Sequence, residues 1–180
     1  MKKNECDISV DGRLKFNRVL PSDIETVWRF LVEDELRAKW LCGGKVDPFE
    51  GGIIEFKFDP EKLGHPSPSD VEDDKYKAEF SGEVISYEPP HKLVFSWPEA
   101  DQSSMTIVKI SLQTVSNGTV LNLTHENLNN PDYLIGASAG WHAHLEQLEC
   151  HLSRQLSPNF WKRHEELDIE YRAKLEAMER

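Results

Sequence analysis

The feature that most constrains the fold of this chain is one long apolar stripe near its C-terminal end. Trp141, Leu145, Leu148, Leu152 and Leu156 recur at spacings of 4, 3, 4 and 4 residues, which is the period of an amphipathic helix. A helix with one apolar face has to bury that face against another element. We therefore expect this helix to lie on a sheet formed by the residues before it.

The residues before the helix show the pattern of antiparallel strands. Between residues 45 and 113, apolar side chains recur at every second position between Gly, Pro and Asp residues, as in half-buried strands. Alternation from Ile8 to Leu20 predicts an earlier, first strand. Asn117–Gly118 predicts a type I′ hairpin turn between strands that end near Val115 and resume at Thr119. We expect about six strands after the first.

Two short helices are expected between the first strand and the others. Ser22 is predicted to cap the first helix, with Glu25 completing a capping box. The second helix adds one or two turns before Gly43–Gly44 stops it. With this arrangement we expect Trp40 to lie near the mouth of the site that the two helices cover.

Two further segments complete the chain. The acidic, proline-containing segment from Asp59 to Asp74 fits neither a helix nor a strand period and predicts a surface loop. After Ser157–Pro158 a more charged helical pattern follows, which we expect to pack back on the rest of the chain. Its apolar side is formed by Leu167, Tyr171, Leu175 and Met178.

The charge balance narrows the range of partners. Acidic residues outnumber basic residues by 32 to 21, and the formal net charge is -11, which opposes binding to nucleic acid and to anionic membranes. Three cysteines without a CxxC spacing argue against a disulfide framework or a cysteine zinc site. We find no signal peptide and no apolar run long enough to span a membrane. The expectation is a cytoplasmic protein without stable membrane association, metal or other cofactor.

Several segments, taken in order, resemble a known group of proteins. They are RVLPSDIETVWRFLV, the Lys39–Trp40 pair, Gly51–Gly52, SGEVISYEPPHKLVFSW, GTVLNLTHENL and GWHAHLEQL. Over residues 16–156 this set is similar to the START-like, or SRPBCC, superfamily, in the subgroup named after the C-terminal domain of the activator of heat-shock-protein-90 ATPase. Residues 160–175 also resemble an extension of bacterial members.

The resemblance implies an α+β fold of the helix-grip type. In this fold a curved antiparallel sheet wraps around the long C-terminal helix, with two short helices after the first strand and here an extra C-terminal helix. We expect residues 1–156 to form the START-like domain and residues 157–180 to form a helical extension packed on it. The fold implies a deep pocket between the sheet and the long helix, and superfamily members hold hydrophobic or amphipathic small molecules there.

Three functions are compatible with this resemblance, because the fold alone does not select one. We place first a non-enzymatic binding protein for a small hydrophobic or amphipathic molecule. The second is an interaction module that stimulates a heat-shock-protein-90-type chaperone ATPase in a stress response, with a chaperone or a second copy of the chain as partner. The activators that name the subgroup carry an additional N-terminal domain, for which this chain has no room. The third is a pocket enzyme of cyclase or hydrolase type, using His125, Arg18 or Tyr87 as acid or base.

Apolar and aromatic side chains of the predicted strands and helices are the candidate pocket residues. Ligand pockets of this type are mostly apolar, with a few polar anchors. The candidates for ligand binding are Trp28, Trp40, Phe56, Phe58, Phe80, Phe95, Trp97, Leu121, Leu123, His125, Trp141 and Leu145. The same side chains could instead fill a core, because the strand period does not tell which face is turned toward the helix.

The polar candidates have alternative explanations. His125 shares strand parity with the leucines before it and either anchors a ligand or is satisfied by nearby groups. Arg18 shares parity with apolar neighbours and either points inward or extends to the rim. On a helix, His142 and His144 lie about 200° apart and cannot chelate one ion together. His142 and Glu146 form an i, i+4 pair that we expect to be solvated. We therefore assign no metal ligand and no catalytic residue.

Overall fold

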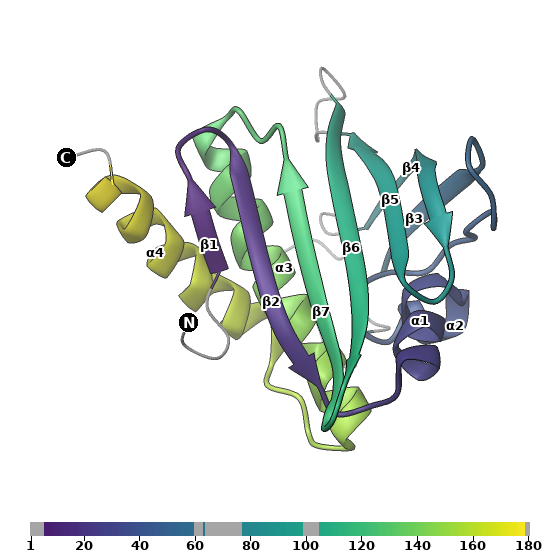
Figure 1. Cartoon of the computed structure of the whole chain (residues 1–180). Helices are drawn as coiled ribbons and strands as arrows, with labels where there is room; N and C mark the ends of the chain where they lie inside the picture. Colours follow the sequence, from purple (N-terminus) through teal and green to yellow (C-terminus); the bar gives the residue numbers. More distant parts are fainter. Residues whose placement is uncertain (1–5, 60–62, 64–76, 99–104, 179–180) are drawn as a thin grey trace.

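A computed structural model of the chain describes residues 6–59, 63, 77–98 and 105–178. Seven strands of this described part form one antiparallel sheet (Figure 1). The strands are β1 (Cys6–Ser9), β2 (Arg13–Leu20), β3 (Ile53–Phe58), β4 (Ala78–Glu88), β5 (Lys92–Pro98), β6 (Met105–Val115) and β7 (Gly118–Glu126). The helices are α1 (Ile24–Val32), α2 (Asp34–Arg37), α3 (Pro131–Ser153) and α4 (Phe160–Met178). This element order confirms the expected α+β helix-grip fold.

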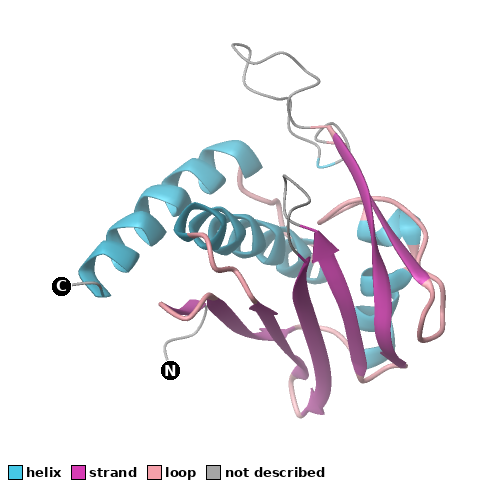
Figure 2. Ribbon diagram, turned by 90° about the horizontal axis from the view of Figure 1, so that it is seen from above, coloured by secondary structure: helices cyan, strands magenta, loops and turns pink. Residues whose placement is uncertain are grey.

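The sheet has the order β1-β2-β7-β6-β5-β4-β3. Strands β3 to β7 follow one another as neighbours, and β2 pairs with β7. Viewed from above, the sheet curves around α3, and α4 lies along the outer side of α3 (Figure 2). Five described strands follow the two short helices, where the sequence pattern predicts about six.

The alternating pattern buries one face of the central strands against α3. Leu14 and Phe16 of β2 are fully buried, and the register places Phe16 beside Leu123 of β7. From α3, Leu145 and Leu148 are buried over this face. Burial of one such side chain stabilises the fold by about 1.5–3 kcal/mol. The apolar side chains of α3 and those on the inner face of the strands therefore form one core.

Two turns differ from the expectation. The alternating segment from Ile8 to Leu20 is two strands, β1 and β2, joined by a turn in which Gly12 has φ 78°. The β6–β7 hairpin is present, but Asn117 does not adopt a positive φ, so the type I′ turn is wrong. Gly118 has φ 140°, and a Cβ there would lie 2.1 Å from the carbonyl oxygen of Leu20. The close approach of β2 therefore requires glycine at the position after the turn.

Two helix ends also differ from the expectation. The N-cap of α1 is Asp23 and not Ser22, since the Asp23 carboxylate accepts a 2.8 Å hydrogen bond from the backbone N–H of Thr26. Helix α3 ends before Arg154, which has φ 55°. Leu156 consequently lies beyond the helix and is 98% exposed. The predicted apolar stripe is correct within α3 and does not extend to this leucine.

Helix α4 packs on α3 with one apolar side. Leu167, Tyr171 and Leu175 are buried, whereas Met178 is 45% exposed. The ammonium group of Lys174 donates a 2.6 Å hydrogen bond to the carbonyl oxygen of Cys6 in β1. Helix α4 is therefore attached both to α3 and to the edge of the sheet.

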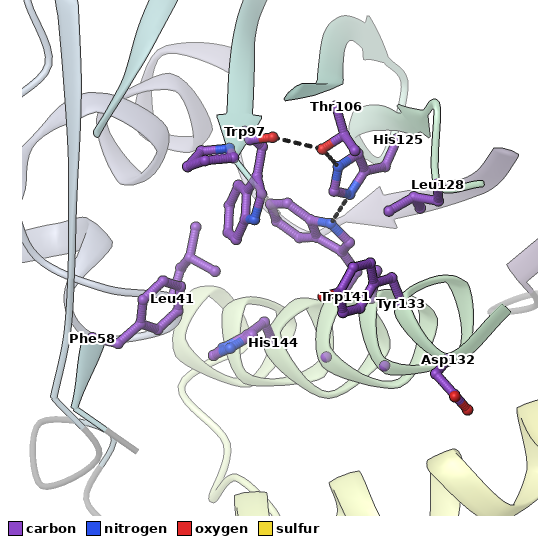
Figure 3. A pocket seen from close by; sticks show the side chains of 14 residues that line it. Leu41, Phe58, Trp97, Thr106, His125, Leu128, Asp132, Tyr133, Trp141 and His144 are labelled. Atoms are coloured by element: carbon purple, nitrogen blue, oxygen red, sulfur yellow. Dashed lines mark hydrogen bonds between the residues drawn. The ribbon is translucent and has the colours of Figure 1, made fainter. Parts of the chain in front are cut away.

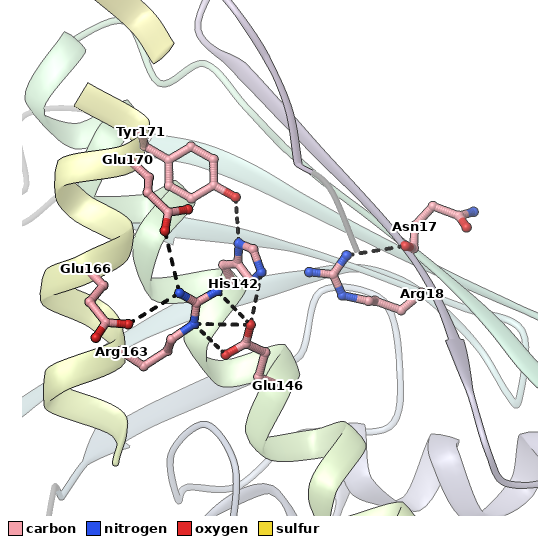
Figure 4. A network of polar contacts seen from close by, with 8 residues as sticks. All are labelled: Asn17, Arg18, His142, Glu146, Arg163, Glu166, Glu170 and Tyr171. Carbon is pink, nitrogen blue, oxygen red and sulfur yellow. Dashed lines mark hydrogen bonds and ion pairs between the residues drawn. The ribbon is translucent and has the colours of Figure 1, made fainter. Parts of the chain in front are cut away.

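Polar contacts between α3 and α4 surround Glu146 (Figure 4). Its carboxylate accepts hydrogen bonds of 2.9 and 3.0 Å from Arg163. Nε2 of His142 lies 3.2 Å from the same carboxylate, and Nδ1 lies 2.7 Å from the hydroxyl of Tyr171. His142 is 8% exposed, so the expectation that this pair is solvated is wrong. Arg18 is also interior, at 1% exposure, and does not extend to the rim.

Two expectations concern segments and helices away from the core. The predicted loop from Asp59 to Asp74 lies almost entirely outside the described residues. Among the helices of the described part, none combines the length and the apolar character needed to cross a membrane. Within the same ranges, no group of three or more His, Cys, Asp or Glu side chains could hold a metal ion.

Candidate functional site

A pocket of about 320 Å³ lies between α3 and one end of the sheet (Figure 3). The end of β5, the start of β6 and the end of β7 meet there because neighbouring strands are antiparallel. The described residues that line the pocket are Leu41, Phe58, Trp97, Pro98, Thr106, His125, Leu128, Asp132, Tyr133, Gly136, Ala137, Gly140, Trp141 and His144. Its volume and mostly apolar lining are typical of sites for small molecules.

Helix α3 presents small residues to this pocket. Gly136 and Gly140 are one helical turn apart, with Ala137 beside them. A Cβ atom added to either glycine would meet no atom within 4 Å. Each glycine in a helix interior costs about 0.5–1 kcal/mol relative to alanine. The two glycines therefore make α3 less stable than alanines would, and they leave open space in the pocket.

His125 belongs to a hydrogen-bond chain inside the pocket wall (Figure 3). The hydroxyl of Thr106 donates to the carbonyl oxygen of Trp97 at 2.8 Å, so the 2.6 Å contact between Thr106 and His125 needs the hydrogen on His125 Nε2. Nδ1 of His125 then accepts from the indole N–H of Trp141 at 3.1 Å. Burial lowers the pKa of His125 to about 3. The imidazole is neutral, and both of its nitrogens are used by the protein itself.

His144 differs from His125 in its hydrogen-bond partners. Its Nδ1 lies 2.6 Å from the carbonyl oxygen of Trp40, so this nitrogen carries the hydrogen and donates it. Burial lowers the pKa of His144 to about 4, although the bond to Trp40 acts in the opposite direction. Nε2 is therefore an acceptor, and no described residue forms a hydrogen bond with it. His144 lines the main pocket and also a hollow of about 40 Å³ next to it.

Trp97 supplies the complementary polar group. Its backbone carbonyl belongs to the hydrogen-bond chain, but its indole N–H has no partner among the described residues. In Figure 3 the indole nitrogen of Trp97 lies on the side of the pocket that faces Trp141. The ring centroids of Trp97 and Trp141 are 5.5 Å apart with an interplanar angle of 58°. The Trp97 indole N–H is thus a donor in a lining that also contains the acceptor Nε2 of His144.

A buried arginine holds the segment that carries Leu41 to the pocket. The guanidinium of Arg37 in α2 donates to the carbonyl oxygens of Cys42, Gly43, Gly44 and Glu55 at 2.6–3.2 Å. These bonds fasten residues 42–44 to β3, and Arg37 is only 1% exposed. The arginine is therefore a positioning residue for Leu41, which lines the pocket, and for Trp40, which binds His144.

Comparison with known proteins places this fold and pocket in a family. The model of the family described as activator of Hsp90 ATPase homolog 1-like protein matches residues 21–153. The chain belongs to this family. The match covers α1 to α3, and with them every described residue that lines the pocket.

Solved structures show the same fold. The protein encoded by gene BPP1335 from Bordetella parapertussis is 26% identical, with 95% of this chain and 90% of that chain covered and a TM-score of 0.78. CalU16 from Micromonospora echinospora is 20% identical over 89% of this chain and 86% of its own, with a TM-score of 0.65. Protein MLL2253 from Mesorhizobium loti is 22% identical over 79% and 97%, with a TM-score of 0.63. A comparison with curated proteins finds no match.

In this family member the twelve candidate residues fall into two groups. Phe58, Trp97, His125 and Trp141 line the pocket. The others lie in the hydrophobic core or pack against it, namely Trp28, Trp40, Phe56, Phe80, Phe95, Leu121, Leu123 and Leu145. Trp40 is 1% exposed and donates its indole N–H to the carbonyl oxygen of Phe30 at 2.8 Å. The expectation that Trp40 lies near the mouth is therefore wrong.

Sequence reasoning did not select several pocket residues of this family member. Gly136 and Gly140 recur at i, i+4 inside a helical pattern, a spacing that could have indicated a small face on the helix. The sequence suggests His144 only as a possible metal ligand and contains no signal for Thr106. The role of His144 depends on which of its nitrogens contacts Trp40, and that contact joins residues 104 positions apart.

Proposed function

We propose that this protein binds a small hydrophobic or amphipathic molecule in the pocket between α3 and the sheet. The observation that carries the proposal is the pair Gly136 and Gly140, where a Cβ would meet no atom within 4 Å. Alanine at either position would fit and would favour the helix. The open volume beside two helix-weakening residues is therefore better explained by an occupant than by packing.

The pocket chemistry supports binding more than acid–base catalysis. His125 has both nitrogens engaged by Trp141 and Thr106. Arg18 and Tyr87, the other acid or base candidates, do not line the pocket. Tyr87 packs its ring against Trp28 at 5.3 Å. These contacts favour a binding protein over the pocket-enzyme alternative.

A pocket-filling variant tests the proposal. In Gly140→Leu the new side chain should occupy the space beside Trp141, and the affinity for the neutral fluorescent probe N-phenyl-1-naphthylamine should fall at least tenfold. Gly140→Ala should bind the probe with a smaller loss and should unfold with a free energy about 0.5–1 kcal/mol higher, because alanine favours the helix. Probe titration and urea unfolding measure the two effects.

Ala173→Leu on the exposed face of α4 is the matched control, since it adds the same side chain to a helix away from the pocket. It should leave the probe affinity unchanged. Native mass spectrometry of the freshly purified wild-type protein should show a bound small molecule that Gly140→Leu lacks. Equal probe affinities in wild type and in a folded Gly140→Leu variant would contradict the proposal.

The family description favours a second candidate function, stimulation of an Hsp90-type chaperone ATPase. The ATP hydrolysis rate of such a chaperone, measured with increasing amounts of this protein, tests it. A saturable rise that Gly140→Leu retains would support a surface contact independent of the pocket. An unchanged rate of ATP hydrolysis would contradict this second function and would not affect the proposal that the pocket binds a small molecule.

A further inference from the structure

A small hollow adjoins the pocket where the pocket comes close to the start of α4. The hollow has a volume of about 40 Å³, and it shares the lining residues Leu41, Phe58 and His144 with the pocket of about 320 Å³. In Figure 3 these three side chains lie at the end of the pocket opposite Leu128. The first two residues of α4 also line the hollow but not the pocket. Helix α4 therefore borders the space directly behind one end of the pocket.

Phe160, the first residue of α4, fills part of this space. Its side chain is 4% exposed, and its ring centroid lies 4.6 Å from that of His144 with an interplanar angle of 39°. Because His144 lines both the pocket and the hollow, Phe160 packs against a side chain that forms the pocket wall. Removing the ring of Phe160 would therefore enlarge the hollow next to that wall.

Polar contacts hold the start of α4 in place. The side-chain amide of Gln147 in α3 donates to the carbonyl oxygen of Pro158 at 3.0 Å. The side-chain oxygen of Asn159 accepts from the backbone N–H of Lys162 at 3.0 Å and so caps α4. Phe160 lies between these two contacts in the chain. Its ring is therefore kept at a fixed position beside His144.

We propose that Phe160 is a specificity-determining residue, whose ring limits the length of the molecule that the pocket accepts at the end near His144. This inference rests on the proposed function and specifies the size of the ligand. Phe160 lies outside residues 21–153, which match the family model, so the limit is set by a part of the chain beyond that match. An apolar chain gains affinity only for methylenes that leave water. A chain that has reached the wall before Phe160 gains nothing from further carbons.

A series of neutral straight-chain alcohols, from 1-hexanol to 1-dodecanol, tests the inference with the intact protein. Displacement of N-phenyl-1-naphthylamine measures the affinity for each alcohol. Each methylene that enters the apolar space should tighten binding about fourfold, until the chain reaches the limit of the wild-type pocket. In Phe160→Ala the limit should move by at least two methylenes. The alcohol two carbons beyond the wild-type limit should then bind at least about tenfold more tightly to Phe160→Ala than to wild type.

Two further variants separate ligand length from a loosened helix. Phe160→Leu keeps an apolar but smaller side chain and should move the limit by about one methylene, which gives a readout if the alanine variant does not fold. Leu175→Ala removes a buried side chain near the other end of α4 that lines neither the pocket nor the hollow. It should weaken the packing of α4 and keep the wild-type limit.

The outcomes distinguish this inference from the proposed function. An unchanged limit in both Phe160 variants, or a wild-type affinity that keeps rising to 1-dodecanol, would overturn the inference and leave the proposed function standing. A Leu175→Ala variant that extends the series as far as Phe160→Ala would also overturn it, because loosening of α4 would then explain the change. If no alcohol displaces the probe, the inference fails. The proposed function fails with it only if Gly140→Leu binds the probe as tightly as wild type.

Discussion

Lowering the pH from 7 to 4 is expected to reduce the free energy of unfolding steeply, on the order of 1 kcal/mol per pH unit for each of two buried histidines. Burial lowers the pKa of His125 to about 3 and that of His144 to about 4, from an ordinary value of 6.5. The unfolded chain therefore takes up protons below about pH 6.5, whereas the folded protein resists them. The stabilisation is fully present above pH 6.5 and is lost as the pH falls toward the folded values.

The His125 part of this effect has a structural cause that can be tested. Protonation would turn Nδ1 into a donor facing the indole N–H of Trp141, which also donates. Urea unfolding between pH 7 and pH 4 should show a shallower pH dependence for His125→Gln than for wild type. His91→Gln, at an exposed turn, should leave the slope unchanged. A His125→Gln curve as steep as the wild-type curve would show that this imidazole is not protected from protonation.

Substitution of Arg37 by methionine is expected to lower the free energy of unfolding by about 3–5 kcal/mol. The arginine donates to four carbonyl oxygens of residues 42–44 and 55, in a site where its own exposure is 1%. Methionine fills a similar volume but removes these donors, and of the four carbonyl oxygens that of Gly43 keeps a hydrogen bond from the backbone N–H of Lys57. Arg37→Lys should restore little, because one ammonium group cannot reproduce the planar guanidinium. Urea unfolding at pH 7 gives the values.

The matched control for Arg37 is another arginine from the same pair of helices. Arg29 of α1 forms an exposed ion pair with Glu33 at 2.7 Å. Arg29→Met should lower the free energy of unfolding far less than Arg37→Met does, because exposed ion pairs contribute little. Similar losses in the two variants would mean that the buried bonds of Arg37 add nothing beyond an ordinary surface pair.

Arg37 also links stability to the site. The segment it holds carries Leu41 into the pocket wall and places the carbonyl oxygen of Trp40 against His144 Nδ1. Loosening the segment would free the hydrogen on His144 to move between its nitrogens. The hydrogen position on His144 is therefore maintained by residues of α2 and β3 as well as by α3.

The candidate site could be anticipated only in part. Phe58, Trp97, His125 and Trp141 are apolar or titratable residues at strand and helix periods, and they line the pocket. Phe56 shares the strand parity of Phe58, yet it is fully buried among other aromatic rings. Because both side chains point to the same face of β3, the alternation cannot tell them apart. Phe58 lies nearer the open end of the sheet and lines the pocket, whereas Phe56 is part of the core.

The apolar stripe of α3, the alternation of the strands and most of the element order can be predicted from the sequence, because side-chain periodicity is local and decides which face is buried. The helix-grip fold follows from these patterns together with the family resemblance. Contacts in the folded chain are needed to show that Gly136 and Gly140 face open space, that both nitrogens of His125 are hydrogen-bonded and that His144 contacts Trp40 through Nδ1. Each of these depends on contacts between residues far apart in the chain, and the hydrogen position on an imidazole is set by whichever distant group it meets.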